Sequence, residues 1–317
     1  MTLLDGPLNA GVEGVTVVGP REHHIYQPLL SHVAGGTAKA SQATRPQADV
    51  MPDRVTLLRD AVASVESETS SVVLASGRRV GYEHLIVCPG IEQDWDSTPG
   101  MRAALSTPSA ASSYEIGLAD KTSRLLRDLR GCTAVFVQAP EPASFAGAVQ
   151  KLMYLACEYW RSRGLLDSIR DVLVLPDASP LGIPEIDEEL ERRIADYGIE
   201  VRRESRLSDV LPEAKTAVIS APADSDSGAG SGSEPERIPY DALIVEPLQR
   251  APEWIAEAGL AGASSREDSE RGFVEVDPRT LQHRRFANVW ALGDVAVSRS
   301  QRSGGALRKQ TKTLAEN

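Results

Sequence analysis

Short apolar runs, each ended by turn-forming residues, dominate the first third of the chain. Residues 15–18 (VTVV) are followed by a Gly-Pro pair, and residues 84–88 (HLIVC) are followed by a Pro-Gly pair. This pattern predicts buried strands of a parallel sheet. A further strand is expected at 54–58. Between 61 and 81, short alternating segments separated by polar breaks predict a β-meander.

The middle of the chain alternates between helical and strand patterns. Helical spacing of apolar residues is found at 114–130, 145–163 and 186–197. Apolar strands are expected beside these helices at 133–137, 171–175 and 199–202. This β-α-β-α-β order predicts a parallel sheet with crossover helices.

The last part of the chain resumes the strand pattern after a polar segment. Residues 223–236 are rich in Ser, Gly and Asp, cannot pack a core, and are interpreted as a flexible hairpin tip or linker. Strands are then expected at 242–245, 272–276 and 288–292, and a helix at 304–314. A chain of 317 residues suits two domains, or one large α/β domain with an insertion.

Composition narrows the classes of partner. The chain is 41% hydrophobic and 25% charged, with a formal net charge of -11, which argues against nucleic-acid binding because that function needs a basic face. The three cysteines have no metal-site spacing, and they fit a reduced, cytoplasmic compartment. No stretch approaches the roughly 18–20 consecutive apolar residues of a transmembrane helix, and the start lacks the pattern of a signal peptide.

Two motifs carry a resemblance to a known family. The first is YEHLIVCPG at 82–90, continued by IEQDW at 91–95. The second is GFVEVDPRTLQHRR at 272–285, followed by FANVWALGD at 286–294. In this order, the motifs resemble those of sulfide:quinone oxidoreductases, within the FAD-dependent pyridine nucleotide-disulfide oxidoreductase family. Shorter matches, YQP at 26–28 and QKLMYL at 150–155, extend the resemblance along the chain.

The resemblance implies an α/β fold with two Rossmann-like dinucleotide-binding domains and a β-meander. Residues 1–110 and 240–317 would form the FAD-binding-type domain, and 111–239 the second Rossmann-like domain. The resemblance further implies FAD as cofactor, a small-molecule electron donor and a quinone-like acceptor. We expect a cytoplasmic location, either free or peripheral to a membrane, and we leave a homodimer open.

The site residues follow from the same motifs. The resemblance places Gly293 and Asp294 at a strand end beside the flavin, where the aspartate would accept hydrogen bonds from ribityl hydroxyls. It also places the turn formed by Cys88, Pro89 and Gly90 near the flavin. Cys88 is interpreted as a small inert residue at the end of a buried strand.

The chain departs from the family pattern at the flavin cradle. A Rossmann flavin site needs a strand, a G-x-G-x-x-G turn and a helix before its second strand. Residues 15–18 match that second strand, and the residues before them (MTLLDGPLNAGVEG) are too few to form such a unit. We therefore expect the first βα unit to be missing. We also expect the chain to end before the family's amphipathic membrane-docking helices.

The family's redox cysteines are also replaced. Phe145 and Val295 occupy their slots, and neither side chain can act as a thiolate nucleophile. No catalytic residue is therefore assigned, and sulfide oxidation by the family mechanism is not expected. Arg302 stands where the family's quinone pocket has a lysine, so it is the candidate residue for that site.

Three functions remain open from the sequence. The first is an FAD-dependent oxidoreductase with altered chemistry. The second is a non-enzymatic remnant or partner-binding scaffold on this fold. The third is an NADH:quinone reductase, which the prolines at 140 and 142 disfavour because they make the loop after 133–137 a poor phosphate cradle. No metal site is predicted, since the pair His23 and His24 lacks further ligands, and His283 is interpreted as structural.

Overall fold

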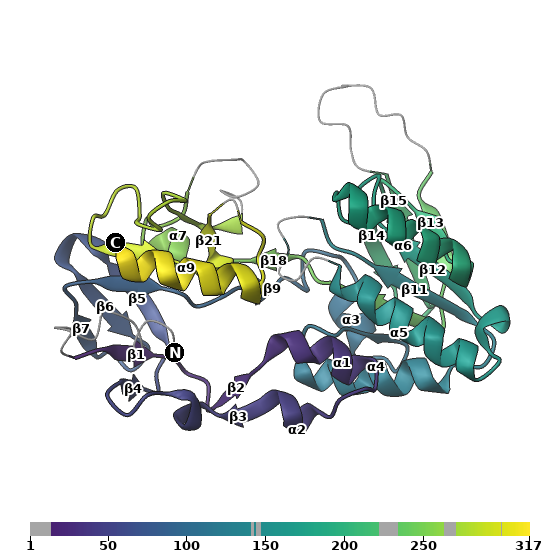
Figure 1. Cartoon of the computed structure of the whole chain (residues 1–317), viewed down its shortest axis with the longest axis horizontal. Helices are drawn as coiled ribbons and strands as arrows, with labels where there is room; N and C mark the ends of the chain where they lie inside the picture. The colour runs from purple at the N-terminus through teal and green to yellow at the C-terminus, as the bar shows by residue number, and fades with distance from the viewer. Residues whose placement is uncertain (1–13, 141–142, 144–146, 222–233, 263–270, 299) are drawn as a thin grey trace. The chain divides into compact units, whose positions relative to one another are not determined.

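A computed structural model describes residues 14–140, 143, 147–221, 234–262, 271–298 and 300–317. These residues form two compact units (Figure 1). Unit 1 comprises Met1–Ile25, Thr44–Glu92 and Gln249–Asn317, and unit 2 comprises Tyr26–Ala43 and Gln93–Leu248. The domain bounds predicted from the sequence, 1–110 with 240–317 and 111–239, differ from the bounds of these units and remain a prediction.

A five-stranded parallel sheet forms the centre of unit 2. Its order is β10 (Ala110–Ala111), β17 (Ala242–Val245), β11 (Thr133–Val137), β12 (Arg170–Val174) and β13 (Glu200–Arg202). Every pairing in it is parallel. All four residues of β17 are buried, as expected for a strand that is covered on both faces.

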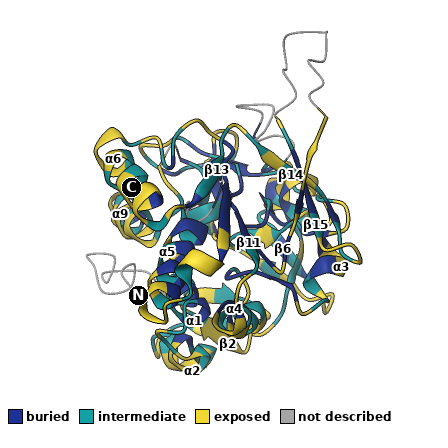
Figure 2. Cartoon of the chain, turned by 90° about the vertical axis from the view of Figure 1, so that its right-hand side faces the viewer, coloured by how far each residue is buried: buried dark blue, intermediate teal, exposed yellow. Residues whose placement is uncertain are grey.

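Helices of unit 2 accompany this sheet. The long ones are α4 (Ile116–Asp128), α5 (Ala148–Ser162) and α6 (Pro184–Tyr197), and the short ones are α1 (Leu30–Ala34), α2 (Ala40–Ala43) and α3 (Met101–Leu105). In α5 the buried residues recur at helical spacing, including Leu152, Ala156 and Trp160. Figure 2 shows the buried residues of α5 and β11 in the interior of this unit.

An antiparallel sheet completes unit 2. It consists of β14 (Arg206–Leu211), β15 (Thr216–Ser220) and β16 (Glu236–Pro239) in that order. Val210, Ala217 and Ile238 are buried in the same core cluster as Val135 and Leu243 of the parallel sheet. The two sheets therefore share one hydrophobic core.

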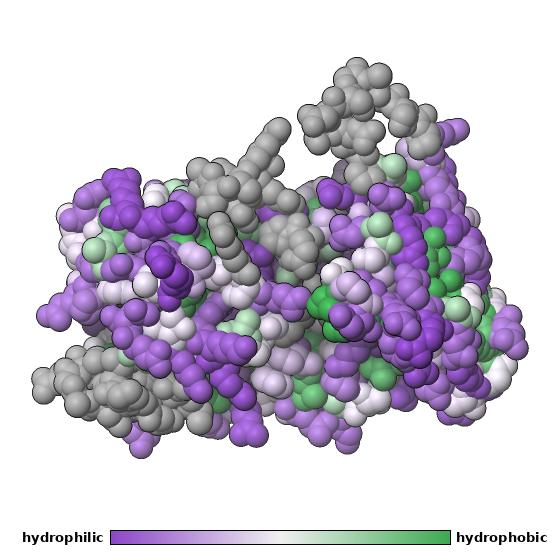
Figure 3. Space-filling view, turned by 45° about the horizontal axis from the view of Figure 1, so that its top comes forward, coloured by the Kyte–Doolittle hydropathy of each residue, from purple (hydrophilic) through white to green (hydrophobic). Residues whose placement is uncertain are grey.

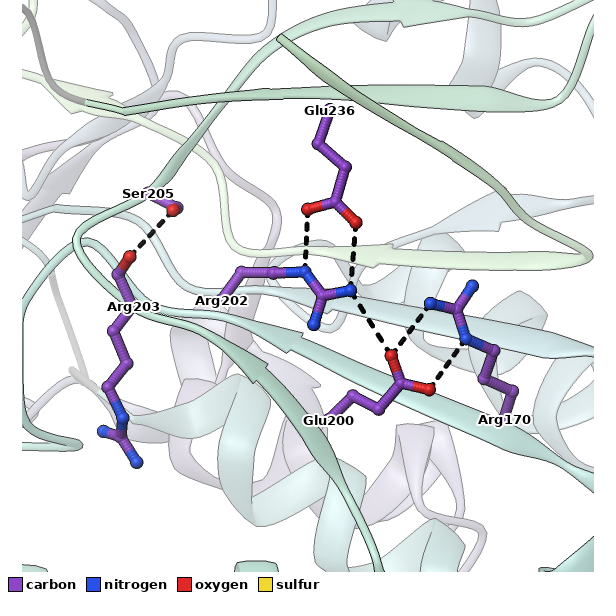
Figure 4. A network of polar contacts seen from close by, with 6 residues as sticks. All are labelled: Arg170, Glu200, Arg202, Arg203, Ser205 and Glu236. Carbon is purple, nitrogen blue, oxygen red and sulfur yellow. Dashed lines mark hydrogen bonds and ion pairs between the residues drawn. The ribbon is translucent and has the colours of Figure 1, made fainter. Parts of the chain in front are cut away.

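Ion pairs join the edges of the two sheets of unit 2 (Figure 4). Arg170 of β12 makes a two-pronged contact with Glu200 of β13, with N–O distances of 2.9 and 2.8 Å. Arg202 of β13 makes the same kind of contact with Glu236 of β16, at 2.7 and 2.9 Å, and also contacts Glu200 at 3.4 Å. We call these four residues the ion-pair ladder.

Unit 1 is built from smaller sheets. Its strands are β1 (Thr16–Val18), β2 (His23–Ile25), β3 (Thr44–Pro46), β4 (Thr56–Leu58), β5 (Val62–Glu66), β6 (Ser71–Leu74), β7 (Arg79–Gly81), β8 (Leu85–Val87), β18 (Gln249–Arg250), β19 (Val274–Glu275), β20 (Val289–Ala291) and β21 (Ala296–Val297). Among the described residues its α-helices are α7 (Trp254–Glu257) and α9 (Gly304–Glu316), and β9 (Glu92–Gln93) spans the boundary of the units. The antiparallel order β5-β6-β7 is the predicted meander.

Two parallel strand pairs of unit 1 share a core. β1 pairs with β4, and β8 pairs with β20. Residues 281–283 flank the other side of β20, where the Ala291 amide donates to the Leu281 carbonyl at 3.0 Å. Among the described residues, β1 pairs with β4 alone and β8 pairs with β20 alone. Val18 and Val87 nevertheless pack on one core cluster.

The structure shifts several predicted element boundaries. The helix expected at 145–163 is α5, which begins after Gly147, because this residue has a φ of +78° and is not helical; residue 145 lies outside the described residues. The strand expected at 272–276 is reduced to the two residues of β19. Of the segment 223–236, only 234–236 is described, and β16 begins at Glu236.

The surface is mainly hydrophilic on the face shown in Figure 3. The exposed large hydrophobic residues among those described are Tyr26, Ile86, Ile186 and Leu307. None of the described helices has the length and apolar character needed to cross a membrane.

Candidate functional site

The ends of two neighbouring strands bring the predicted flavin-contacting residues together. β8 and β20 are parallel and in register, with Val87 opposite Ala291. The Leu292 amide donates to the Val87 carbonyl at 3.3 Å, so the pairing continues to the carboxyl ends. The turn of Cys88, Pro89 and Gly90 therefore starts beside the turn of Gly293 and Asp294, although 203 positions of sequence separate Gly90 from Gly293.

Both turns use glycine in a left-handed conformation. Gly90 has a φ of +79° and Gly293 has a φ of +78°, which disfavours any residue with a Cβ atom. A Cβ atom built on Gly90 would meet no atom within 4 Å, so the backbone faces open space there. Cys88 and Pro89 are exposed beside it. This turn is therefore accessible to a ligand.

Residues after β20 hold the Gly293–Asp294 turn through its backbone. The Gly293 amide donates to Oε1 of Gln310 at 2.8 Å, and the amide nitrogen of Gln310 donates to the hydroxyls of Ser298 and Ser300 at 2.9 and 3.0 Å. Gln310 is buried on α9. It was missed by sequence reasoning, because an isolated Gln in a helical pattern carries no recognisable signal.

Arg302 also donates a hydrogen bond to the backbone of this turn. Its Nε donates to the Asp294 carbonyl at 2.7 Å, and its guanidinium carbon lies 4.1 Å from the centre of the buried Phe273 ring. These contacts orient Arg302 toward the turn. A role for Arg302 in a quinone site stays a prediction.

The two positions that match the family's redox cysteines hold Phe145 and Val295. Val295 is fully buried in the core of unit 1, where its side chain packs among apolar residues. Phe145 lies outside the described residues. Cys88 is the only cysteine in the sequence of unit 1, and it is exposed.

His283 has a structural environment. Its Nδ1 accepts hydrogen bonds from the amides of Arg285 and Phe286 at 3.1 and 3.2 Å, and its Nε2 lies 3.3 Å from the Leu260 carbonyl. Burial lowers the pKa of His283, which favours the neutral ring carrying its proton on Nε2. The side chain thereby fixes a tight turn. In the described part of the chain, no group of three or more His, Cys, Asp or Glu residues could hold a metal ion.

The carboxyl end of β11 is where an NAD phosphate loop would lie in unit 2. There the buried Gln138 accepts a hydrogen bond from Gln150 at 2.6 Å. Both amide groups also donate to the Pro180 carbonyl, at 3.3 and 2.9 Å. The Gln138 and Gln150 side chains thus occupy this strand end with hydrogen bonds to each other and to the Pro180 carbonyl.

The described residues fit one side of a dinucleotide site. They supply two adjacent strand ends with glycine turns, of which the one at Gly90 faces open space, and glycine is the residue that lets a ligand approach the backbone closely. Residues 1–13, which precede β1, lie outside the described residues, so the predicted absence of the first βα unit stays a prediction. The ends of β8 and β20 are therefore the candidate contact surface for a cofactor in the described part of the chain.

Comparison with known proteins identifies the relatives of the chain. No protein-family model matches it. The mitochondrial sulfide:quinone oxidoreductase of Mus musculus is 27% identical over 304 residues, which cover 96% of this chain. The chain resembles sulfide:quinone oxidoreductases. It spans 64% of the length of this curated relative.

Solved structures agree on the fold. The sulfide:quinone oxidoreductase from Aquifex aeolicus superposes with a TM-score of 0.80 at 16% identity, over 96% of this chain and 70% of that one. NDH2 from Plasmodium falciparum in complex with NADH gives a TM-score of 0.65 at 15% identity, over 89% of this chain and 59% of that one. The predicted fold class, an α/β fold of two Rossmann-like dinucleotide-binding domains, is confirmed.

Proposed function

We propose that this sulfide:quinone oxidoreductase-like chain is an FAD-dependent oxidoreductase that transfers electrons from a small donor to a quinone or similar acceptor. One observation carries the proposal. The two motifs of the resemblance, far apart in sequence, form adjacent turns at the ends of β8 and β20. Both turns contain a left-handed glycine, and the one at Gly90 faces open space.

Named residues would hold the flavin at this edge. The carboxylate of Asp294 would accept hydrogen bonds from ribityl hydroxyls, and the turn of Cys88, Pro89 and Gly90 would lie along the ring system. The flavin supplies the electron-accepting chemistry when bound. Arg302 and Gln310 support the site by fixing the backbone of the Gly293–Asp294 turn.

The chemistry we propose does not use the family's cysteine pair. A buried Val295 cannot form or break a disulfide, and Phe145 has no thiol. The donor therefore reduces the flavin without a sulfur-transfer step on the protein. Sulfide should not bleach the flavin of this chain at a rate above that of free FAD.

Flavin binding is the first test. The full chain, incubated with FAD and then desalted, should keep an absorption band near about 450 nm. Asp294→Asn should weaken FAD binding roughly tenfold, because a hydrogen bond to a charged group contributes about 1.5–3 kcal/mol. Fluorescence titration of FAD gives the dissociation constant, and the FAD-induced rise in melting temperature gives a readout that does not depend on activity.

Asp53→Asn is the matched control, since Asp53 is an exposed aspartate elsewhere in unit 1. It should bind FAD as the unmodified chain does. A chain that stays colourless after incubation with FAD would contradict the proposal and favour the remnant or partner-binding scaffold.

Electron transfer is the second test. The FAD-loaded chain, reduced with dithionite, should be reoxidised by a short-chain quinone, followed at the flavin band. NADH should not reduce it, because Gln138, Gln150 and Pro180 close the strand end where the nicotinamide nucleotide would bind. Rapid reduction by NADH would instead support the NADH:quinone reductase alternative.

A further inference from the structure

A small cavity opens in unit 2, outside the proposed flavin site. Its volume is about 280 Å³, and it is lined by Arg130, Tyr159, Arg163 and Leu165. Arg130 follows the end of α4, whereas Tyr159 lies in the last turn of α5 and Arg163 directly follows that helix. The ends of two helices therefore contribute cationic side chains to one cavity.

A third guanidinium lies against the aromatic wall of this cavity. The guanidinium carbon of Arg127 is 5.2 Å from the centre of the Tyr159 ring, and that of Arg163 is 5.6 Å from it. Two guanidinium groups thus lie at cation–π distance from the Tyr159 ring. Such packing restricts the guanidinium groups without neutralising their charge.

Backbone carbonyls, not carboxylates, anchor two of the three arginines. Arg127 donates from Nη2 to the Gly36 carbonyl at 2.8 Å. Arg130 donates from Nη1 to the carbonyls of Arg127 and Leu129 at 2.7 and 2.8 Å. Each guanidinium has five N–H donors, so these contacts leave several donors available.

No ion pair within the described ranges involves Arg127, Arg130 or Arg163. The nearest acidic residues in sequence, Asp128 and Asp167, are exposed and make no such pair either. Many other arginines of this acidic chain do pair with carboxylates, the ion-pair ladder among them. In the described part of the chain, these three arginines are therefore not held by ion pairs with carboxylates.

We propose that this cavity binds a small phosphate-bearing anion of about the size of a diphosphate. Planar guanidinium groups match pairs of phosphate oxygens, and several of them together suit a multiply charged anion. The cavity lies just below the volume range of pockets for drug-sized ligands, which favours a small group. The alternative role, arginines that only cap the ends of α4 and α5, predicts no saturable binding.

Inorganic pyrophosphate is the probe, titrated calorimetrically into the full chain at about 50 mM salt to limit screening. We expect one saturable site. Arg163→Gln should weaken binding at least roughly tenfold, because one charge-assisted contact contributes about 1.5–3 kcal/mol. Among the described residues the Arg163 side chain makes no hydrogen bond, so the variant should keep its fold, which circular dichroism verifies.

Arg124→Gln is the matched control, because Arg124 is an exposed arginine of α4 that does not line the cavity. It should bind pyrophosphate as the unmodified chain does. Asp294→Asn should do the same, which separates this cavity from the flavin site. The proposal is overturned if pyrophosphate shows no saturable binding, or if Arg163→Gln binds as tightly as the unmodified chain. Equal weakening by Arg124→Gln would also overturn it, since it would indicate diffuse charge attraction.

Discussion

Asp171 is a carboxyl group in the interior of unit 2. It lies on β12, is 3% exposed, and its Oδ2 is 3.5 Å from the thiol of Cys157 on α5. Its other oxygen, Oδ1, has no hydrogen-bond partner among the described residues. Burial raises the pKa of Asp171 to about 7, since a charged carboxylate is poorly solvated there. The folded chain therefore holds this proton more tightly than the unfolded chain does.

The stability of unit 2 should consequently fall as the pH rises. Between the unfolded pKa of 3.8 and the folded pKa of about 7, the folded state binds more protons, so the free energy of unfolding decreases with pH. The loss is on the order of 4 kcal/mol across that window, at about 1.4 kcal/mol per pKa unit. Asp171→Asn should flatten this dependence, as measured by urea unfolding at a series of pH values.

Asp120→Asn, at an exposed aspartate of α4, should keep the full pH slope. The slope is the better readout, because a buried Asn amide brings its own unsatisfied donors and lowers stability at every pH. An unchanged slope in the Asp171 variant would show that another group titrates.

At the residue scale, the sequence predicted the positions of residues whose motif requires a particular backbone conformation. Gly90 and Gly293 lie in turns that need a positive φ, and the motifs placed them at strand ends. Gln310 and the Cys157–Asp171 pair had no such signal. Their importance comes from tertiary contacts between elements distant in sequence, which a pattern of single residues does not encode.

At the level of elements, the ion-pair ladder links strands of two different sheets. Arg170, Glu200, Arg202 and Glu236 lie on β12, β13 and β16, and the carboxylates are about two-fifths exposed. The Arg202 guanidinium lowers the pKa of Glu236, and Arg170 lowers that of Glu200. Each carboxylate therefore contributes stability above its unfolded pKa, which is lost as the pH falls through its folded pKa.

Glu236→Gln should lower the melting temperature modestly. Because the pair is partly exposed, the expected cost is about 0.5–1 kcal/mol at low ionic strength. The difference should shrink in about 1 M NaCl, where the Debye length is only about 3 Å. Differential scanning fluorimetry at both salt concentrations measures this.

Glu213→Gln provides the comparison, because Glu213 is exposed in the turn between β14 and β15 and makes no ion pair in the described structure. It should melt like the unmodified chain at both salt concentrations. If Glu236→Gln melts in the same way, the ladder contributes no net stability.

Element prediction succeeded for strands with uniform apolar composition. β11 and β17 were predicted residue for residue, since strands buried on both faces form continuous apolar runs. β14 and β15 were missed, because partly exposed strands such as Arg206–Leu211 mix charged and apolar positions. Their pairing also depends on β16, which lies beyond a polar segment in sequence.

At the scale of the whole molecule, each unit has its own hydrophobic core. Phe273, Val289 and Val295 belong to the cluster of unit 1, and Val172 and Leu243 to that of unit 2. The sequence predicted the α/β class from alternating patterns, and both the predicted domains and the two units interleave along the chain, with different bounds. Tyr26–Ala43 belongs to unit 2 because α1 packs on α4 and α5. Local sequence patterns give no signal for such tertiary packing.

Separate cores should respond separately to core mutations. Val289→Ala, in the core of unit 1, should accelerate hydrogen exchange in that unit while leaving the β10-β17-β11-β12-β13 sheet unchanged. Val172→Ala should do the converse. Each change should cost on the order of 1–3 kcal/mol, and mass spectrometry of peptic fragments resolves the two units. Faster exchange in both units after either change would show that the chain unfolds as a single cooperative body.

The hydrogen bond from the Gly293 amide to Gln310 couples helix α9 to the Gly293–Asp294 turn. Few side chains of α9 are buried in unit 1, namely Gln310 and Leu314. Arg308, Lys309 and Lys312 of the same helix are exposed. A helix held so lightly opens more readily than a central strand. When α9 unfolds locally, the Gly293 amide loses its hydrogen-bond acceptor and the turn beside β8 is no longer restrained. Local unfolding of α9 and loosening of the proposed flavin site are therefore coupled.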